Sequence, residues 1–117
     1  MEAALAKAAE WVDEAWFQGR LYRVARYPGV VASDAASDRV IGDVWRLSGP
    51  DVLARLDRYE ACDPQDPASP YVREEREIRL AAGGAAQAWI YLYNRPTAEL
   101  ELIPSGDFLA SRHDRDR

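Results

Sequence analysis

The sequence is poor in the side chains from which the commonest catalytic and metal sites are built. It contains one histidine, His113, in a charged tail (residues 111–117), and one cysteine, Cys62. These two residues alone predict neither a zinc site of ordinary type, nor a Ser-His-Asp or Cys-His pair, nor an internal disulfide. No Walker or dinucleotide fingerprint occurs, because the pair Gly83-Gly84 separates two strand-like segments and predicts a hairpin turn. We therefore expect no metal and no cofactor, and any catalysis must use a carboxylate, aromatic rings and backbone groups.

The sequence also lacks an excess of positive charge and long apolar segments. With 15 basic against 20 acidic residues, and Lys7 as the only lysine, its net charge is −5. Nucleic acids and anionic membranes require a basic surface, so we expect neither as a partner. No apolar run is long enough to cross a membrane, and the N-terminus does not have the pattern of a signal peptide. The single cysteine suits a reducing compartment, so we expect a soluble, cytoplasmic protein.

The residues that are present predict a single α+β domain. A length of 117 residues and a hydrophobic content of 48% suffice for one core, which we place in residues 1–110. The predicted elements are an amphipathic helix over 1–12, strands over 16–24 (with a bulge at Gly19) and 40–47, a helix starting near 50, and a hairpin over 71–80 and 86–93. The second arm of this hairpin carries bulky residues on both faces, which predicts a central strand. We expect a small curved, mostly antiparallel sheet that closes toward a barrel, with a pocket at the open end.

Glu60 is the candidate catalytic residue. The helix predicted to start near residue 50 ends just before the proline-rich loop 63–70, so Glu60 lies beside Tyr59 at the mouth of that loop. A glutamate is most often a solvated surface residue, and that is the ordinary interpretation of this one. Its position, and the scarcity of other candidates, favour a general acid/base.

Seven stretches, read together, resemble the gamma-glutamylcyclotransferase-like family. They are GRLY (19–22), YPGV (27–30), IGDVWRL (41–47), LDRYE (56–60), YVR (71–73), AWIYLYN (88–94) and IPSGDF (103–108). They occur in the family's order and span almost the whole chain, so together they are specific although each alone is not. The resemblance implies a small barrel with flanking helices. It also implies an enzyme in which the free α-amine of a γ-glutamyl group attacks its own γ-amide carbonyl, giving 5-oxoproline and a released amine.

The resemblance also implies roles for three residues. Glu60 matches the glutamate of the family's Leu-Asp-x-aromatic-Glu motif, which acts as general acid/base. Tyr71 and Tyr91 match positions whose hydroxyls would line the substrate pocket. Closure of a five-membered ring within one molecule mainly needs holding and orientation, so it requires neither a metal nor a nucleophilic side chain. The leaving amine stays open, because glutathione, γ-glutamyl amino acids and γ-glutamyl-lysine crosslinks share the same reacting end.

One motif of the family is missing from the sequence. Family members begin with a strand ending in Tyr-Gly-Ser/Thr-Leu, whose backbone donors hold the γ-glutamyl group. No such tetrapeptide occurs here, and Met1 opens on the helix that normally follows it. We therefore expect this chain, whether truncated or a natural variant, to have weak or no cyclotransferase activity. We also expect an exposed sheet edge, which a second copy of the chain covers in a homodimer.

A second interpretation is a non-catalytic module that binds a small molecule or a partner on the same barrel. Tyr71 and Tyr91 are then amphipathic rings of the core or its rim. On either interpretation we expect Arg73 to pair with an acid on a neighbouring strand and Asp57 to cap the helix or pair locally. The tryptophans expected in the core are Trp16, Trp45 and Trp89.

Overall fold

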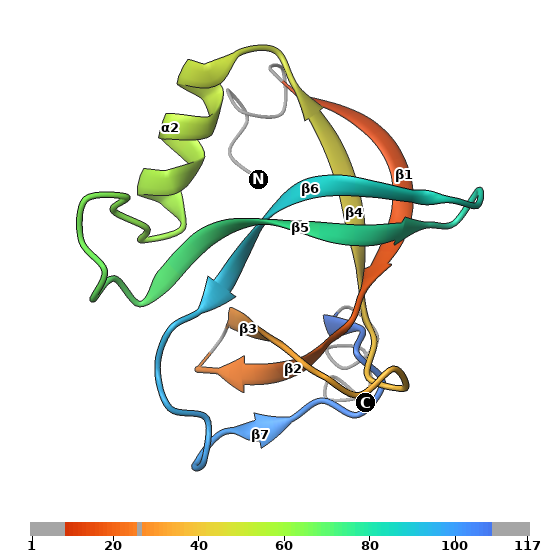
Figure 1. Cartoon of the computed structure of the whole chain (residues 1–117). Coiled ribbons are helices and arrows are strands. Elements are labelled where there is room, and N and C mark those ends of the chain that lie inside the picture. Colours follow the sequence, from red (N-terminus) through yellow and green to blue (C-terminus); the bar gives the residue numbers. More distant parts are fainter. Residues whose placement is uncertain (1–8, 26, 109–117) are drawn as a thin grey trace.

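The computed structural model describes residues 9–25 and 27–108 (Figure 1). In chain order the elements are β1 (Ala9–Phe17), β2 (Gly19–Val24), β3 (Tyr27–Ala32), β4 (Val40–Leu47), α2 (Pro50–Tyr59), β5 (Tyr71–Leu80), β6 (Ala85–Tyr93) and β7 (Glu101–Leu102). The strand pairings between them are antiparallel, which confirms the predicted α+β class with its mostly antiparallel sheet. The tail 111–117, with His113, lies outside the described residues.

The strands form two sheets, and the chain passes from one to the other after β1, β3 and β6. One sheet has the order β4-β1-β5-β6 and the other the order β3-β2-β7. Only Gln18 separates β1 from β2, so the chain passes directly from the first sheet to the second. The bulge expected at Gly19 is instead this crossing point, where a side chain on the buried glycine would collide with the carbonyl oxygen of Val31. The irregularity in the pairing of β1 with β4 lies between Trp11 and Asp13.

Residues 9–12 belong to a strand, so the prediction of a helix was wrong there. In β1, Ala9 lies opposite Leu47 and Trp11 lies opposite Trp45 of β4. The alanine content favours a helix locally, but pairing with β4 satisfies the backbone groups and gives Trp11 an aromatic cross-strand neighbour. Tertiary pairing thus overrides the local preference. The rest of the predicted helix, residues 1–8, lies outside the described residues.

The long hairpin is confirmed, although its second arm is not a central strand. β5 and β6 pair from Tyr71 opposite Tyr93 onward, and Gly83 and Gly84 make the turn with φ values of 109° and 85°. β6 is the last strand of its sheet, so burial between two neighbouring strands does not explain the bulky residues on both of its faces. Leu92 packs into the core, whereas Tyr91 on the other face lines a groove between β6 and β4.

The hydrophobic core consists of two adjoining clusters that Val30 connects. The cluster under the four-stranded sheet contains Ala15, Phe17, Ile78 and Leu92, and the second contains Leu21, Val40 and Ile103. The tryptophans expected in the core lie elsewhere: Trp45 and Trp89 are 43% and 51% exposed, and Trp16 is half-buried beneath the guanidinium of Arg39. Within the described ranges, no helix has the length and apolarity needed to cross a membrane.

Candidate active site

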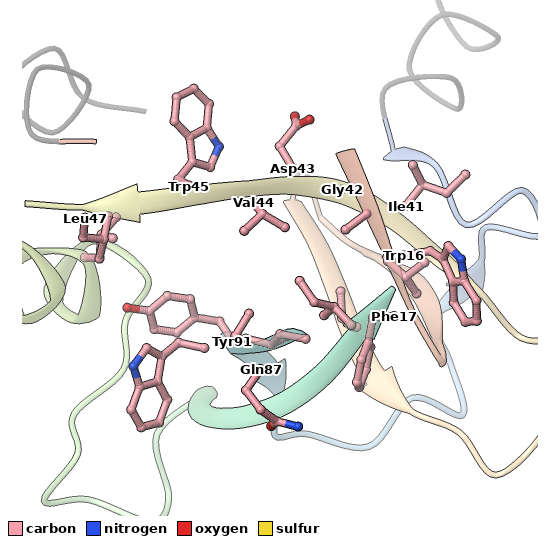
Figure 2. Close-up of a pocket in the computed structure, with 18 of the residues that line it drawn as sticks. Trp16, Phe17, Ile41, Gly42, Asp43, Val44, Trp45, Leu47, Gln87 and Tyr91 are labelled. Carbon is pink, nitrogen blue, oxygen red and sulfur yellow. The ribbon is translucent and has the colours of Figure 1, made fainter. Parts of the chain in front are cut away.

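A large apolar groove lies between the two end strands of the four-stranded sheet. Its volume is about 630 Å³, and its lining includes residues 40–45 and 47 of β4 and residues 87–91 of β6. Val44 and Tyr91 lie on either side of this space, whereas Asp43 and Trp45 stand on the opposite side of β4 (Figure 2). Leu53 and Leu56 of α2 also contribute to the lining. The curvature of the sheet thus brings its two edges to one groove, which is the kind of pocket expected at an open barrel.

Tyr91 lines this groove, but its hydroxyl is already engaged with the protein. It donates a hydrogen bond of 2.7 Å to Oδ1 of Asp57 on α2. Burial and this hydrogen bond both raise the pKa of Tyr91, so its phenol is neutral and remains a donor at physiological pH. The hydroxyl therefore fixes the helix to β6.

Asp57 is the centre of a buried anchor between α2 and the β5–β6 hairpin. It is 5% exposed and accepts hydrogen bonds from Nε of Arg73 at 2.8 Å and from Nη2 at 3.1 Å. The guanidinium of Arg73 also lies 4.5 Å from the centre of the Trp89 ring. The local role expected for Asp57 and the strand-to-strand pair expected for Arg73 were both wrong. A bidentate, charge-assisted pair on a buried carboxylate is the strongest kind of side-chain contact available to a helix.

The end of α2 places Glu60 by a well-defined backbone turn. The N–H groups of Ala61 and Cys62 bond to the carbonyl oxygens of Arg58 and Asp57, at 3.3 and 2.8 Å, in the pattern of a Schellman motif. Ala61 takes the left-handed conformation that this motif requires, with a φ of 54°. Glu60 is the C-cap residue, so it lies between buried Asp57 and buried Cys62. A backbone hydrogen bond joins Asp57 and Cys62 across this turn.

This turn predicts that Ala61→Gly stabilises the protein. An L-residue pays a conformational cost of about 1 kcal/mol in the left-handed region, which glycine avoids, while the more flexible unfolded chain of the variant offsets part of the gain. We expect the free energy of unfolding in urea to rise by about 0.5 kcal/mol. Ala54→Gly, at an exposed interior position of the same helix, is the matched control and should lower it by about 1 kcal/mol. Equal losses in both variants would contradict the assignment of the turn.

An electrostatic interaction links Glu60 and Tyr71, two of the three predicted site residues. Burial raises the pKa of the half-buried Glu60 carboxyl. Burial also raises the pKa of Tyr71, and the negative charges of Glu60 and of ionised Tyr93 raise it further. The Tyr71 hydroxyl donates to the carbonyl oxygen of Pro28 at 3.0 Å, and its ring meets that of Tyr93 edge-on. Tyr91 belongs to the neighbouring groove, two residues from Tyr93 along β6, and neither Glu60 nor Tyr71 lines that groove.

The raised pKa of Glu60 predicts a pH-dependent difference between the parent protein and Glu60→Gln. Between the ordinary value of 4.5 and the raised value, the folded state binds more protons than the unfolded state, so the parent loses stability as the pH rises through this window. Glutamine carries no such charge. We expect urea unfolding to give nearly equal stabilities at pH 4 and a more stable variant at pH 7.5. Glu99→Gln, at an exposed loop position, should show no such trend.

The Glu60 carboxyl can exchange a proton with a bound molecule. A half-buried carboxylate with a raised pKa is a stronger base than a solvated one. Its protonated form also persists to a higher pH. Residues 9–25 and 27–108 contain no cluster of three or more acidic, cysteine or histidine side chains that could hold a metal ion. The sequence interpretation did not place Asp57 and Arg73, two residues of the anchor, in the site. Leu53 and Asp57 are four residues apart on α2, and a charged residue on an apolar helix face was the one available signal of a buried partner.

The antiparallel sheets and the helix between β4 and β5 define the class of the protein as a small α+β domain. The model of the family described as "Gamma-glutamyl cyclotransferase, AIG2-like" matches residues 1–110. The chain belongs to this family, which confirms the resemblance found in its motifs.

Known relatives agree with this assignment. The gamma-glutamylcyclotransferase family protein YtfP of Escherichia coli K12 is 34% identical over 98 residues, which are 84% of this chain and 71% of the relative. The solution structure of ytfP from E. coli superposes with a TM-score of 0.67 at 29% identity, covering 99% of this chain and 88% of that one. YkqA from Bacillus subtilis shares the fold, with a TM-score of 0.72 at 20% identity over 96% of this chain and 36% of its own.

Proposed function

We propose that this protein cyclises γ-glutamyl amides to 5-oxoproline and releases the amine, with Glu60 as general acid/base. The observation that carries the proposal is a half-buried carboxyl with a raised pKa at the end of α2, in a chain of the gamma-glutamylcyclotransferase family.

The proposed reaction needs one group that both accepts and returns a proton. The α-ammonium of the γ-glutamyl group gives a proton to the Glu60 carboxylate, and the free amine attacks the γ-carbonyl carbon, so that a new C–N bond closes the five-membered ring. The bond between that carbon and the leaving nitrogen then breaks as Glu60 returns the proton to the departing amine. The ring nitrogen still carries two hydrogens and loses one of them through Glu60 to the released amine, which leaves as an ammonium ion. Atoms and charge balance without a co-reactant.

The energetics of this reaction suit a site in which one carboxyl carries out both proton transfers. An ordinary glutamate is a weak base toward an ammonium, and a raised pKa narrows the gap between the two groups. Nucleophile and carbonyl belong to one molecule, so orientation supplies a large part of the rate acceleration. The protein's task is then to hold the substrate against Glu60 and to exclude water from it.

Tyr71 and Tyr91 are proposed as substrate-binding residues through their free lone pairs. Each hydroxyl donates its hydrogen to the protein, to the carbonyl of Pro28 and the carboxylate of Asp57 respectively. A phenol oxygen that donates one hydrogen bond can still accept another. Both tyrosines can therefore accept a hydrogen bond from the substrate's ammonium or amide N–H. Tyr71, which interacts electrostatically with Glu60, is the better placed of the two to receive the ammonium.

The test is 5-oxoproline release from a panel of γ-glutamyl amides, including glutathione, γ-glutamyl amino acids and γ-glutamyl-lysine. We expect slow release, as foreseen for a sequence without the Tyr-Gly-Ser/Thr-Leu motif. N-acetyl-γ-glutamyl amides are the matched control, because their blocked amine cannot attack. Release from the blocked substrates would contradict the mechanism, and rapid release from the free ones would contradict the expectation of weak activity.

The second candidate is a non-catalytic binding module, which the 630 Å³ apolar groove favours because its lining does not include Glu60 or Tyr71. Calorimetric binding of a γ-glutamyl amide without any release of 5-oxoproline would support this module. The homodimer and the cytoplasmic location also stay predictions. A molar mass by light scattering of one chain, 13.2 kDa, would contradict the homodimer.

A further inference from the structure

Within residues 9–25 and 27–108, Glu60 and Asp57, three positions before it, differ sharply in their side-chain hydrogen bonds. Glu60 makes no side-chain hydrogen bond among the described contacts, and only its backbone N–H is fixed, to the carbonyl oxygen of Leu56 at 2.8 Å. Asp57, by contrast, is buried and accepts three side-chain hydrogen bonds, from Arg73 and Tyr91. The position of the Glu60 carboxyl therefore depends on contacts that other residues make.

The two donors to Asp57 come from one point of the hairpin. Arg73 of β5 and Tyr91 of β6 lie directly opposite each other, and the pair Tyr71–Tyr93 lies two residues further along the same strands. Residues two apart on a strand share a face, so all four side chains lie on one face of the hairpin. The first pair holds Asp57 of α2 on this face, and Tyr71 of the second pair donates to the carbonyl oxygen of Pro28 in β3.

We propose that Asp57 is a positioning residue for the proposed reaction: its clamp on Arg73 and Tyr91 holds the end of α2 so that the Glu60 carboxyl stays half-buried. The proposal rests on the proposed function for its catalytic consequence, but not for its structural one. The backbone continues the clamp, because the carbonyl oxygen of Asp57 accepts the N–H of Cys62 beyond Glu60. One residue thus holds both ends of the short segment that carries Glu60.

The test measures the pKa of Glu60 directly, by NMR titration of protein with ¹³C-labelled glutamate carboxyls. The Glu60 resonance is assigned by its loss in Glu60→Gln. In Asp57→Asn we expect the pKa of Glu60 to fall toward that of an ordinary glutamate, because the freed helix end exposes the carboxyl to water. Asp38→Asn removes a carboxylate from a surface pair with Arg20 of similar length, 2.9 Å, and is the matched control with no expected change.

Arg73→Gln separates positioning from a direct effect of charge. Removing the positive charge of Arg73 without any movement cannot lower the pKa of Glu60, whereas loss of the clamp exposes the carboxyl and lowers it. We expect a fall in Arg73→Gln as well as in Asp57→Asn. A fall in Asp57→Asn with a rise in Arg73→Gln, or an unchanged pKa in both folded variants, would overturn the proposal.

Tyr91→Phe keeps the test decisive if both charge variants fail to fold by circular dichroism. It removes one of the three hydrogen bonds and changes no charge, so a smaller fall in the pKa of Glu60 supports positioning and an unchanged pKa overturns it. If the parent protein releases 5-oxoproline, Asp57→Asn should lower kcat by about 10²-fold with little change in KM. If the parent does not turn over, the proposed function fails while the titration still decides the role of Asp57.

Discussion

Glu60→Gln is expected to lower the rate of 5-oxoproline release by about 10²–10⁴-fold, the usual contribution of a general acid/base. Glutamine has nearly the same shape as glutamate and can fill the same half-buried position, but it cannot take a proton from the substrate's ammonium or return it to the leaving amine. The expected loss lies in kcat, with KM nearly unchanged. Steady-state kinetics with a γ-glutamyl amide, followed by chromatographic detection of 5-oxoproline, measure both constants.

Two further variants show whether the loss belongs to Glu60 itself. Glu99→Gln makes the same change at an exposed loop position and should leave the rate unaltered. Glu60→Asp keeps an ionisable carboxyl but retracts it by one methylene, so it should retain more activity than Glu60→Gln. A Glu60→Gln protein with undiminished kcat would remove Glu60 from the mechanism.

Asp57→Ala should produce the largest loss of stability, about 3–5 kcal/mol in the free energy of unfolding. The substitution leaves Arg73, whose side chain is 18% exposed, with a charge that no carboxylate balances, and it deprives the Tyr91 hydroxyl of its acceptor. Breaking a buried pair from one side costs more than the pair itself contributes, because the remaining charge stays desolvated. Urea unfolding followed by circular dichroism measures the change.

Matched variants separate the buried pair from ion pairs in general. Asp38→Ala breaks the Arg20–Asp38 pair, whose side chains are 50% and 29% exposed, and should change stability little. The double variant Asp57→Leu/Arg73→Met replaces both charges by apolar groups and should recover much of the loss of Asp57→Ala. A loss in Asp57→Ala no larger than in Asp38→Ala would show that the buried pair does not hold the helix.

Elements that depend mainly on local sequence patterns were predictable from the sequence. The strand 40–47, the helix after Pro50 and the hairpin around Gly83-Gly84 follow from alternation, a proline at the helix start and glycines at positive φ. The seven collinear motifs also identified the family, because several motifs in order carry more information than any one of them.

Features that depend on partners distant in the sequence were not predictable in the same way. Residues 9–12 look helical alone, and only pairing with β4 makes them a strand. Trp89 looks like a core residue, yet it lies at a sheet edge beneath the guanidinium of Arg73. The Asp57–Arg73 pair joins residues 16 positions apart, and nothing in either segment alone indicates which acid the arginine meets.

The alignment of Arg73 with Tyr91 also has a consequence for how the chain folds. A hairpin can form in several registers, and a slip by one residue turns every side chain to the other face. A slip by two residues keeps the faces but separates Arg73 from Tyr91, so Asp57 could then reach one donor and not both. Only the native register lets the helix dock with three hydrogen bonds. Docking of the helix therefore stabilises the native register relative to a shifted one.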